Sequence, residues 1–206
     1  MITGVNLSKK FGDTGLSKTD ITVNEGELVV LSGQSGCGKS TLLNILTGML
    51  SPDTGTVTIN GEDLYKLPEK KRAKLRRNVT GYMMQKNSLI PELTVLQNIL
   101  FSSGLKGSDE DRKKAKDIAE SLHIADRLDA YPGELSGGEY RRAVLARVLM
   151  LDTPVIVADE PTSNLDMESA GVVRTILTGL NREGKTLIVA THDQMLIDCA
   201  KKVIAV

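Results

Sequence analysis

Residues 33 to 40 read Gly33-Gln34-Ser35-Gly36-Cys37-Gly38-Lys39-Ser40, which is a complete G-x-x-x-x-G-K-S phosphate loop. Its glycines allow the backbone to curl so that successive amide N–H groups point inward and can hold phosphate oxygens. A helix that follows directs its positive N-terminal end at the same anion. The Lys39 ammonium can then reach the β- and γ-phosphates of a nucleotide, and the Ser40 hydroxyl can bind Mg²⁺.

The segments on both sides of this loop are those that a phosphate loop requires. Residues 27–31 form a short apolar run suited to a buried strand, and residues 41–46 continue as a helix. The alternative is a glycine- and serine-rich turn that matches the pattern by chance. A strand before the loop and a helix after it favour the nucleotide-binding interpretation.

The overall composition excludes several classes of function. The 206 residues suit one α/β domain with a large core. Basic and acidic residues balance at 26 each, so no polyanion-binding surface is indicated. Trp is absent, which argues against aromatic platforms for single-stranded nucleic acid. We therefore expect no nucleic-acid partner.

The cysteines and the hydropathy pattern bear on the compartment. Cys37 lies in the phosphate loop and Cys199 in a late apolar stretch, so we expect no disulfide and a reducing, cytoplasmic setting. We expect no secretory leader, and no segment approaches the ~20 apolar residues of a membrane span. If the protein acts at a membrane, another chain must supply the spans.

Apolar strand-like runs alternate with helical patterns along most of the chain, which favours a largely parallel sheet built from βαβ units. Strands are predicted near residues 2–8, 20–24, 28–32, 56–60, 79–84, 155–158 and 186–190. Helices are predicted at 68–77 and about 168–182. From about 94 to 151 no strand is predicted, and Ser108 marks the start of a helix that runs to His123. We interpret 94–151 as a helical insert.

A second motif, Asp159-Glu160, follows the apolar run 155–158 directly. It places two carboxylates at the C-terminal edge of the sheet, where α/β proteins bind ligands. Asp159 can hold Mg²⁺ through water, and Glu160 can polarise an attacking water as a general base. A surface turn is the alternative, but the end of a buried strand is an unfavourable place for two idle carboxylates.

A third motif, Leu135-Ser136-Gly137-Gly138-Glu139, opens a helix over 140–150. Alone it reads as a helix start that is capped by Ser136. Together with the phosphate loop and Asp159-Glu160, it resembles the signature motif of ATP-binding-cassette (ABC) ATPases. The resemblance covers nearly the whole chain. It implies an α/β P-loop NTPase fold with a mostly parallel sheet core, an N-terminal antiparallel β part and a helical subdomain at about 87–151 within one domain, 1–206.

The resemblance also accounts for other residues in order. Gln85 matches the family's Q-loop glutamine, residues 163–166 match the D-loop, and His192 matches the switch histidine. Phe11 stands where the family carries an aromatic residue that stacks on adenine, although a core position is the alternative for this side chain. One departure is Tyr140, where the family usually has Gln or Arg. We expect this change to alter packing beside the signature rather than the γ-phosphate contact.

The family's mechanism implies a head-to-tail homodimer, or a pseudo-symmetric dimer, that encloses two ATP molecules. The residues expected to bind ATP in one subunit are Phe11, Gly33, Gln34, Ser35, Gly36, Cys37, Gly38, Lys39, Ser40 and Thr41. Ser136, Gly137 and Gly138 of the other subunit are expected to cap the γ-phosphate. Mg²⁺ is assigned to Ser40, Gln85 and Asp159, and catalysis to Glu160, His192, Lys39 and Gln85.

The same resemblance implies a transmembrane permease as partner, contacted through about residues 86–99. The pattern Gln-x-x-x-Leu-x-Pro-x-Leu-Thr at 85–94 and the stretch 132–139 look most like the lipoprotein-releasing, macrolide- and antimicrobial-peptide-exporting branch. We therefore expect an ATPase on the inner face of the cell membrane that drives export of a peptide, lipoprotein or drug. The alternative is a non-transporting ABC ATPase that transmits force or signal to a membrane partner, as in cell division. A soluble ABC ATPase working on DNA or ribosomes is disfavoured by the lack of a basic surplus.

Overall fold

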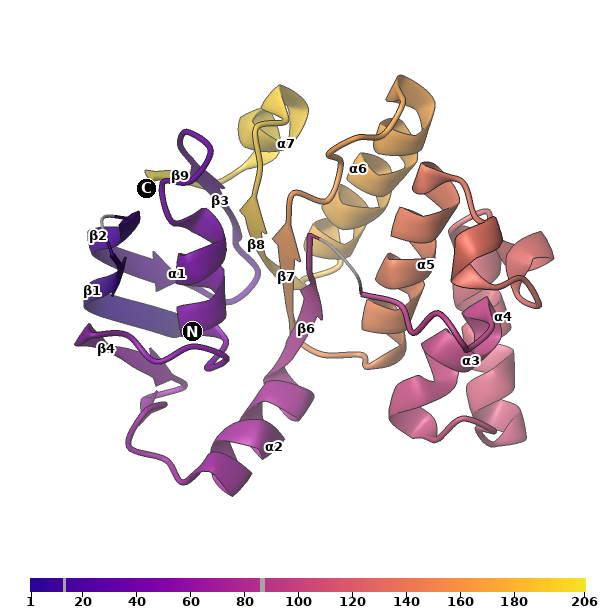
Figure 1. Ribbon diagram of the computed structural model, residues 1–206, viewed down its shortest axis with the longest axis horizontal. Coiled ribbons are helices and arrows are strands. Elements are labelled where there is room, and N and C mark those ends of the chain that lie inside the picture. Colours follow the sequence, from indigo (N-terminus) through magenta and orange to yellow (C-terminus); the bar gives the residue numbers. More distant parts are fainter. Residues whose placement is uncertain (13, 86–87) are drawn as a thin grey trace.

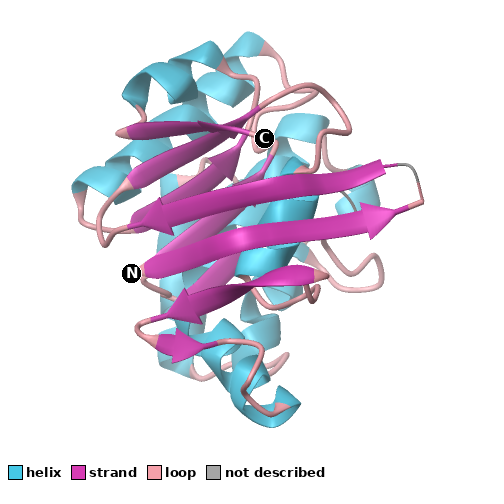
Figure 2. Ribbon diagram, turned by 90° about the vertical axis from the view of Figure 1, so that its left-hand side faces the viewer, coloured by secondary structure: helices cyan, strands magenta, loops and turns pink. Residues whose placement is uncertain are grey.

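Two β-sheets packed around one helix form the part of the molecule that carries the phosphate loop. The computed structural model describes residues 1–12, 14–85 and 88–206. The first sheet is antiparallel, in the order β2-β1-β4-β5, with β2 (Thr14–Val23), β1 (Ile2–Phe11), β4 (Thr54–Ile59) and β5 (Glu62–Asp63). Figure 2 shows this sheet in front of the second one.

The second sheet is parallel, and its strands end at one common edge. Its order is β6-β7-β8-β3-β9, with β6 (Thr80–Met83), β7 (Val155–Asp159), β8 (Thr186–Ala190), β3 (Leu28–Ser32) and β9 (Lys202–Ala205). Every residue of β7 and β8 is buried, because elements cover both faces, and this explains their continuous apolar sequence. The carboxyl ends of β3, β6, β7 and β8 lead into the segments that hold the predicted site residues.

Helix α1 (Lys39–Leu46) lies between the two sheets and contacts strands of both. Its buried residues, Leu42, Leu43, Ile45 and Leu46, share one apolar core with residues of both sheets. Burial of this kind is worth about 1.5–3 kcal/mol for each large side chain. The packing therefore fixes the helix whose first residues close the phosphate loop.

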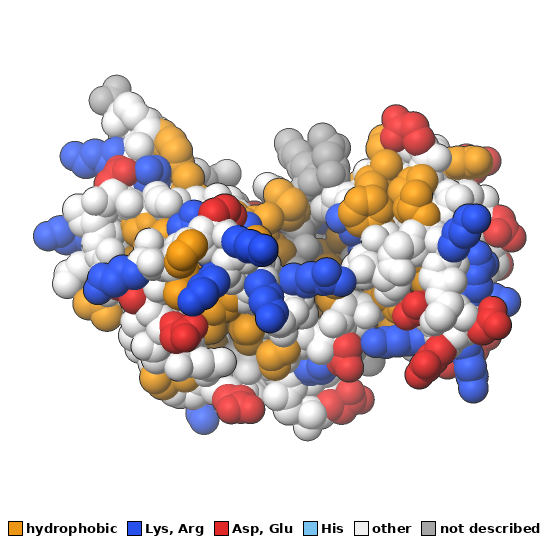
Figure 3. Space-filling model, turned by 90° about the horizontal axis from the view of Figure 1, so that it is seen from below, with side chains coloured by type: hydrophobic (Ala, Val, Ile, Leu, Met, Phe, Trp, Pro, Cys, Tyr) orange, Lys and Arg blue, Asp and Glu red, His pale blue; other side chains and the backbone are white. Residues whose placement is uncertain are grey.

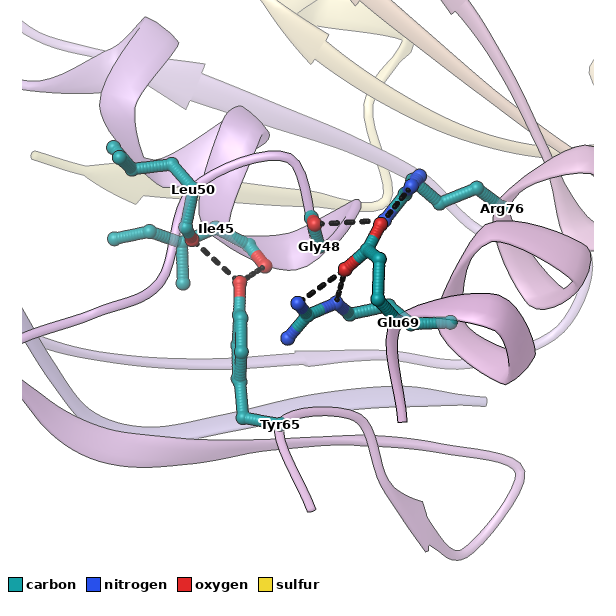
Figure 4. A network of polar contacts seen from close by, with 7 residues as sticks. Ile45, Gly48, Leu50, Tyr65, Glu69 and Arg76 are labelled. Carbon is teal, nitrogen blue, oxygen red and sulfur yellow. Dashed lines mark hydrogen bonds and ion pairs between the residues drawn. The ribbon is translucent and has the colours of Figure 1, made fainter. Parts of the chain in front are cut away.

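A polar network secures the other end of α1 (Figure 4). The Tyr65 hydroxyl lies 2.6 Å from the carbonyl oxygen of Ile45 and 2.5 Å from that of Leu50. From helix α2 (Glu69–Val79), Arg76 donates to the carbonyl of Gly48 at 3.0 Å and pairs with Glu69 at 2.7 Å. These contacts anchor the end of α1 and the segment that follows it, from Gly48 to Leu50, to Tyr65 and to α2.

The remaining helices gather on the opposite side of the parallel sheet from the antiparallel sheet (Figure 1). They are α3 (Val95–Leu100), α4 (Asp109–Ser121), α5 (Gly137–Met150), α6 (Met167–Arg182) and α7 (Gln194–Cys199), with short 3-10 turns η1 (Phe101–Ser103), η2 (Ala125–Arg127) and η3 (Pro132–Glu134). Residues 88–151 contain no strand. Across the described parts of the chain, no helix combines the length and apolar character needed to cross a membrane.

The predicted α/β class, with a parallel core, an antiparallel N-terminal part and a helical insert, is confirmed. Some of the boundaries predicted for strands were wrong. Strand β2 begins at Thr14 rather than near residue 20, and β5 and β9 were not predicted. In the first half of β2 the polar residues Thr14, Ser17 and Lys18 are exposed, so this half lacks the apolar pattern that marks a buried strand, whereas β9 has a short apolar run, Val203-Ile204-Ala205, that was not assigned to a strand.

Candidate functional site

The phosphate loop follows β3 and is tightly constrained by its surroundings. Gly33 and Gly38 have φ angles of +153° and +108°, which side chains rarely adopt. A Cβ atom on Gly33 would lie 2.5 Å from the carbonyl oxygen of Val206, and one on Gly38 would lie 3.1 Å from the carbonyl oxygen of Gly15. The loop can therefore take this path only with glycine at both positions.

Lys39 places its ammonium group inside this loop. The side chain is buried, and Nζ donates to the carbonyl oxygens of Gly33 at 2.7 Å and Gln34 at 3.1 Å. His192 Nε2, which follows β8, lies 3.2 Å from the same Nζ. A buried cation that binds backbone carbonyls inside the loop attracts an anion such as a phosphate group.

One pocket joins the loop to the ends of the neighbouring strands. Its lining residues are Phe11, Thr14, Gly15, Ser35, Gly36, Gly38, Lys39, Ser40, Thr41, Gln85, Asp159, Glu160 and His192. Phe11 is half exposed at the end of β1, so the core alternative for this side chain was wrong. Thr14 and Gly15 were missed by the sequence analysis, because they reach the pocket through the pairing of β2 with β1.

Asp159 is the most deeply buried carboxylate of the pocket. Burial raises the pKa of Asp159, while a hydrogen bond from Ser40 and the charges of Lys39 and Arg141 act to lower it. Ser40, Gln85 and Asp159 thus offer one hydroxyl, one amide and one carboxylate oxygen to the same space. In the part of the chain that the structure describes, no group of three His, Cys, Asp or Glu side chains could hold a metal alone. This donor set fits Mg²⁺, which keeps several waters and shares its site with phosphate oxygens.

Glu160 occupies a strained turn just beyond β7. Its φ angle is +48°, in the left-handed region that glycine favours. Its N–H donates to the carbonyl of Ala190 at 2.8 Å, and its own carbonyl accepts from the Ser163 hydroxyl at 3.0 Å. The carboxylate Oε1 lies 3.4 Å from His192 Nε2. Backbone bonds to a buried strand therefore hold this carboxylate at the mouth of the pocket.

The signature residues lie elsewhere. Ser136 caps α5, where its hydroxyl accepts from the N–H of Glu139 at 3.3 Å. A Cβ atom on Gly137 would meet only the carbonyl oxygen of Asn164 at 3.9 Å, and one on Gly138 would lie 2.3 Å from Ser169 Oγ. None of these three residues lines the pocket of its own chain. The pocket thus brings together most of the residues predicted for it, whereas Gly33, Gln34 and Cys37 of the loop and the three signature residues are not among its lining residues.

Glu139 gives the signature helix a pH-dependent stability. Hydrogen bonds from Ser136 and Arg127 lower the pKa of Glu139 from 4.5 to about 2. A lowered pKa stabilises the folded state above the unfolded value, and this contribution is lost as the pH falls from 4.5 toward 2. We expect Glu139→Gln to lower the free energy of unfolding by about 1 kcal/mol at pH 7. Urea unfolding at pH 7 and pH 3 measures the effect. A deficit that is as large at pH 3 as at pH 7 would contradict the assignment.

The sequence of the chain is similar to those of several known proteins. A model of the ABC transporter family matches residues 16–163. An uncharacterised ABC transporter ATP-binding protein of Methanocaldococcus jannaschii is 41% identical over 211 residues, which cover 99% of this chain and 94% of the relative. The lipoprotein-releasing system ATP-binding protein LolD 1 of Caulobacter vibrioides is 40% identical over 182 residues, 86% of this chain and 78% of the relative. The macrolide export ATP-binding/permease protein MacB 1/2 of Paracoccus denitrificans is 38% identical over 193 residues, 93% of this chain and 29% of the relative.

Solved structures give the same result. A dimeric bacterial ABC transporter cassette has a TM-score of 0.92 and 33% identity, over 100% of this chain and 94% of that one. A dimeric cassette in a post-hydrolysis state, bound to ADP and Pi, has a TM-score of 0.90 and 32% identity over the same shares. The resemblance on which the sequence analysis relied is confirmed.

Proposed function

The chain belongs to the ABC transporter family, and on that premise we propose that it drives a membrane permease that exports a peptide, lipoprotein or drug. It is an ATPase cassette of the kind that dimerises, with lipoprotein-releasing and macrolide-exporting relatives. The observation that carries the proposal is the pocket where the phosphate loop, two carboxylates and His192 meet while the signature residues stay outside it. We infer that the signature residues of a second copy of the chain complete this pocket.

We assign the pocket residues to the following roles. Phe11 supports the adenine ring, while the loop amides and Lys39 bind the phosphates. Ser40, Gln85 and Asp159 would hold Mg²⁺, which when bound offsets the phosphate charge. Glu160 accepts a proton from the attacking water, and His192 contacts the γ-phosphate. His192 Nε2 lies 3.2 Å from Lys39 Nζ and 3.4 Å from Glu160 Oε1. One imidazole can therefore contact both the lysine that binds the phosphates and the carboxylate that accepts the proton.

The signature residues act on the ATP of the partner subunit in this account. The N-terminus of α5, where Ser136 and Gly137 are exposed, forms an anion site, and the Ser136 N–H there already binds the Glu139 carboxylate of its own chain at 2.8 Å. In a head-to-tail dimer this site completes the partner's pocket. Hydrolysis then depends on closure of the dimer, which makes ATP the ligand of a two-state switch.

The permease would dock beside residues 88–99; Lys86 and Asn87, which belong to the predicted contact, lie outside the described residues. The buried Asn98 side chain holds this segment, since its amide bonds to backbone groups of Ile90, Leu93 and Thr94 at 2.8 to 3.0 Å. The segment therefore presents a rigid exposed tip at Pro91 and Glu92.

The neighbouring surface supports docking of a partner on the same side. The exposed apolar side chains on this side of the molecule include Met49, Met84, Phe101 and Leu105. Arg77 of α2 donates to the carbonyl of Ser102 at 3.4 Å, so α2 borders this surface. Figure 3 shows Lys and Arg side chains gathered over α2, with hydrophobic side chains beside them. We infer that these exposed apolar side chains contribute to the surface on which the permease docks.

Purification from native membranes tests the proposed function. We expect the tagged chain to retain an integral membrane permease, and Glu92→Lys to reduce that retention about tenfold by reversing a charge at the docking tip. The matched control is Glu120→Lys on the exposed face of α4. ATP hydrolysis by the isolated variants should equal that of the parent chain. Recovery of no membrane protein, or equal loss in both variants, would contradict the proposal. Transport by the reconstituted complex separates a transporter from a force-transmitting module.

A further inference from the structure

Helix α5 holds the segment that contains Gln85 through buried side chains. Arg141 is 8% exposed, and its Nη1 donates to the carbonyl oxygen of Met84 at 3.0 Å. Met84 is the residue directly before Gln85. The bond therefore sets the position of the backbone from which Gln85 enters the pocket.

The second arm of the same guanidinium reaches the turn beyond β7. Arg141 Nη2 donates to the Ser163 hydroxyl at 3.3 Å, and that hydroxyl donates to the carbonyl oxygen of Glu160 at 3.0 Å. The planar guanidinium presents its donors in a fixed fork, so two acceptors that it binds are held at a fixed separation. Arg141 thus links the backbone at Gln85 with the backbone at Glu160.

Helix α5 also binds the residues that follow Gln85 in the sequence. The Tyr140 hydroxyl accepts from the N–H of Leu89 at 3.1 Å, and Arg147 donates to the carbonyl oxygen of Ser88. Helix α5 begins at the signature residues Ser136–Gly138. A shift of this helix therefore acts on Gln85, on Glu160 and on the signature at once.

The charge of Arg141 also acts on the pocket. Burial lowers the pKa of Arg141, and the charges of Asp159 and Glu160 are among the groups that raise it again. Burial raises the pKa of Asp159, and the charge of the Arg141 guanidinium acts against that rise. Arg141 is outside the pocket lining, so it influences the reacting groups without contact with a nucleotide bound there.

We propose that Arg141 is a positioning residue for ATP hydrolysis. It holds the backbone before Gln85 and the turn at Glu160 at the separation that turnover requires. The proposal rests on the roles proposed above for Gln85 and Glu160. It applies to the chemical step, because the hydrogen bonds of Arg141 to described residues go to Met84 and Ser163, whereas Lys39 is bound by Gly33, Gln34 and His192. Loss of the link should therefore lower kcat while ATP affinity stays the same.

Steady-state kinetics of Arg141→Met test this inference. We expect kcat to fall about tenfold or more while KM for ATP stays within about twofold, the pattern of an interaction that acts on the transition state. Arg147→Met is the matched control. It also removes a half-buried guanidinium of α5 that binds a carbonyl of the same segment, but it leaves Ser163 untouched. Its kcat should fall less than about threefold at a similar loss of melting temperature.

A double-mutant cycle separates positioning from general destabilisation. Because Arg141 reaches Glu160 through Ser163, Ser163→Ala should lower kcat in the parent chain and add little in the Arg141→Met background. If Arg141→Met does not fold, Arg141→Lys replaces it, since a single ammonium can keep the charge but not both bonds. Additive effects, an unchanged kcat, or equal losses in the Arg141 and Arg147 variants would each overturn the inference. Normal turnover by Glu160→Gln would instead remove the role proposed for Glu160, on which this inference rests.

Discussion

Glu160→Gln should bind ATP as tightly as the parent chain and hydrolyse it about 100-fold more slowly or worse. Gln has the same shape as Glu and can keep the +48° backbone conformation, because the bonds to Ala190 and Ser163 come from the main chain. What it loses is the ability to accept a proton from water. Because ATP then persists in the site, the variant should accumulate as an ATP-bound dimer.

Single-turnover hydrolysis and size-exclusion chromatography with ATP measure both parts of this expectation. Glu120→Gln, which changes an exposed carboxylate on α4, is the control and should match the parent chain in both assays. Turnover of Glu160→Gln at the parental rate would show that this carboxylate is not the base. A slow variant that stays monomeric with ATP would contradict the link between hydrolysis and dimer opening.

Gly137→Asp should abolish turnover and leave folding and ATP binding largely intact. Gly137 has an ordinary φ angle, and the nearest atom to a Cβ built there is 3.9 Å away, so the new side chain fits. A carboxylate in the first turn of α5 even complements the helix dipole. In the dimer that we propose, however, it would face the γ-phosphate of the partner's ATP, where like charges repel.

Gly133→Asp is the matched control for this substitution. It adds the same charge four residues before Gly137, and a Cβ there meets no atom within 4 Å. We expect normal turnover from Gly133→Asp and a loss of at least about 100-fold from Gly137→Asp, with equal ATP affinity in both. Equal turnover by the two variants would contradict the role of the signature.

The fold and most of the pocket could be predicted from the sequence because their signals are local. An apolar strand followed by the phosphate loop, and another that ends in Asp159-Glu160, identify strand ends that a parallel sheet must bring to one edge. The first half of β2 and the two-residue strand β5 carry no such pattern. Their positions depend on pairing with other strands rather than on their own residues.

Long-range side-chain contacts are the part that local patterns do not reveal. Arg141 meets Met84 across 57 positions and Ser163 across 22. The sequence drew attention to Tyr140 as a departure from the family pattern and predicted altered packing there. Its bond to Leu89 gives that departure a definite partner. The family resemblance assigned the signature to the ATP of the other subunit, and the signature residues are absent from the pocket lining of their own chain.

The central claim is that each ATP site is built from two chains, and a mixed dimer tests it most directly. Lys39→Ala removes the cation of the phosphate loop, and Gly137→Asp blocks the signature. Each variant alone should be inactive. In a dimer of one chain of each kind, one site carries both defects and the other carries neither, so single-turnover hydrolysis of ATP should return at that intact site. Mixed dimers that form and still hydrolyse no ATP in a single turnover would contradict the account.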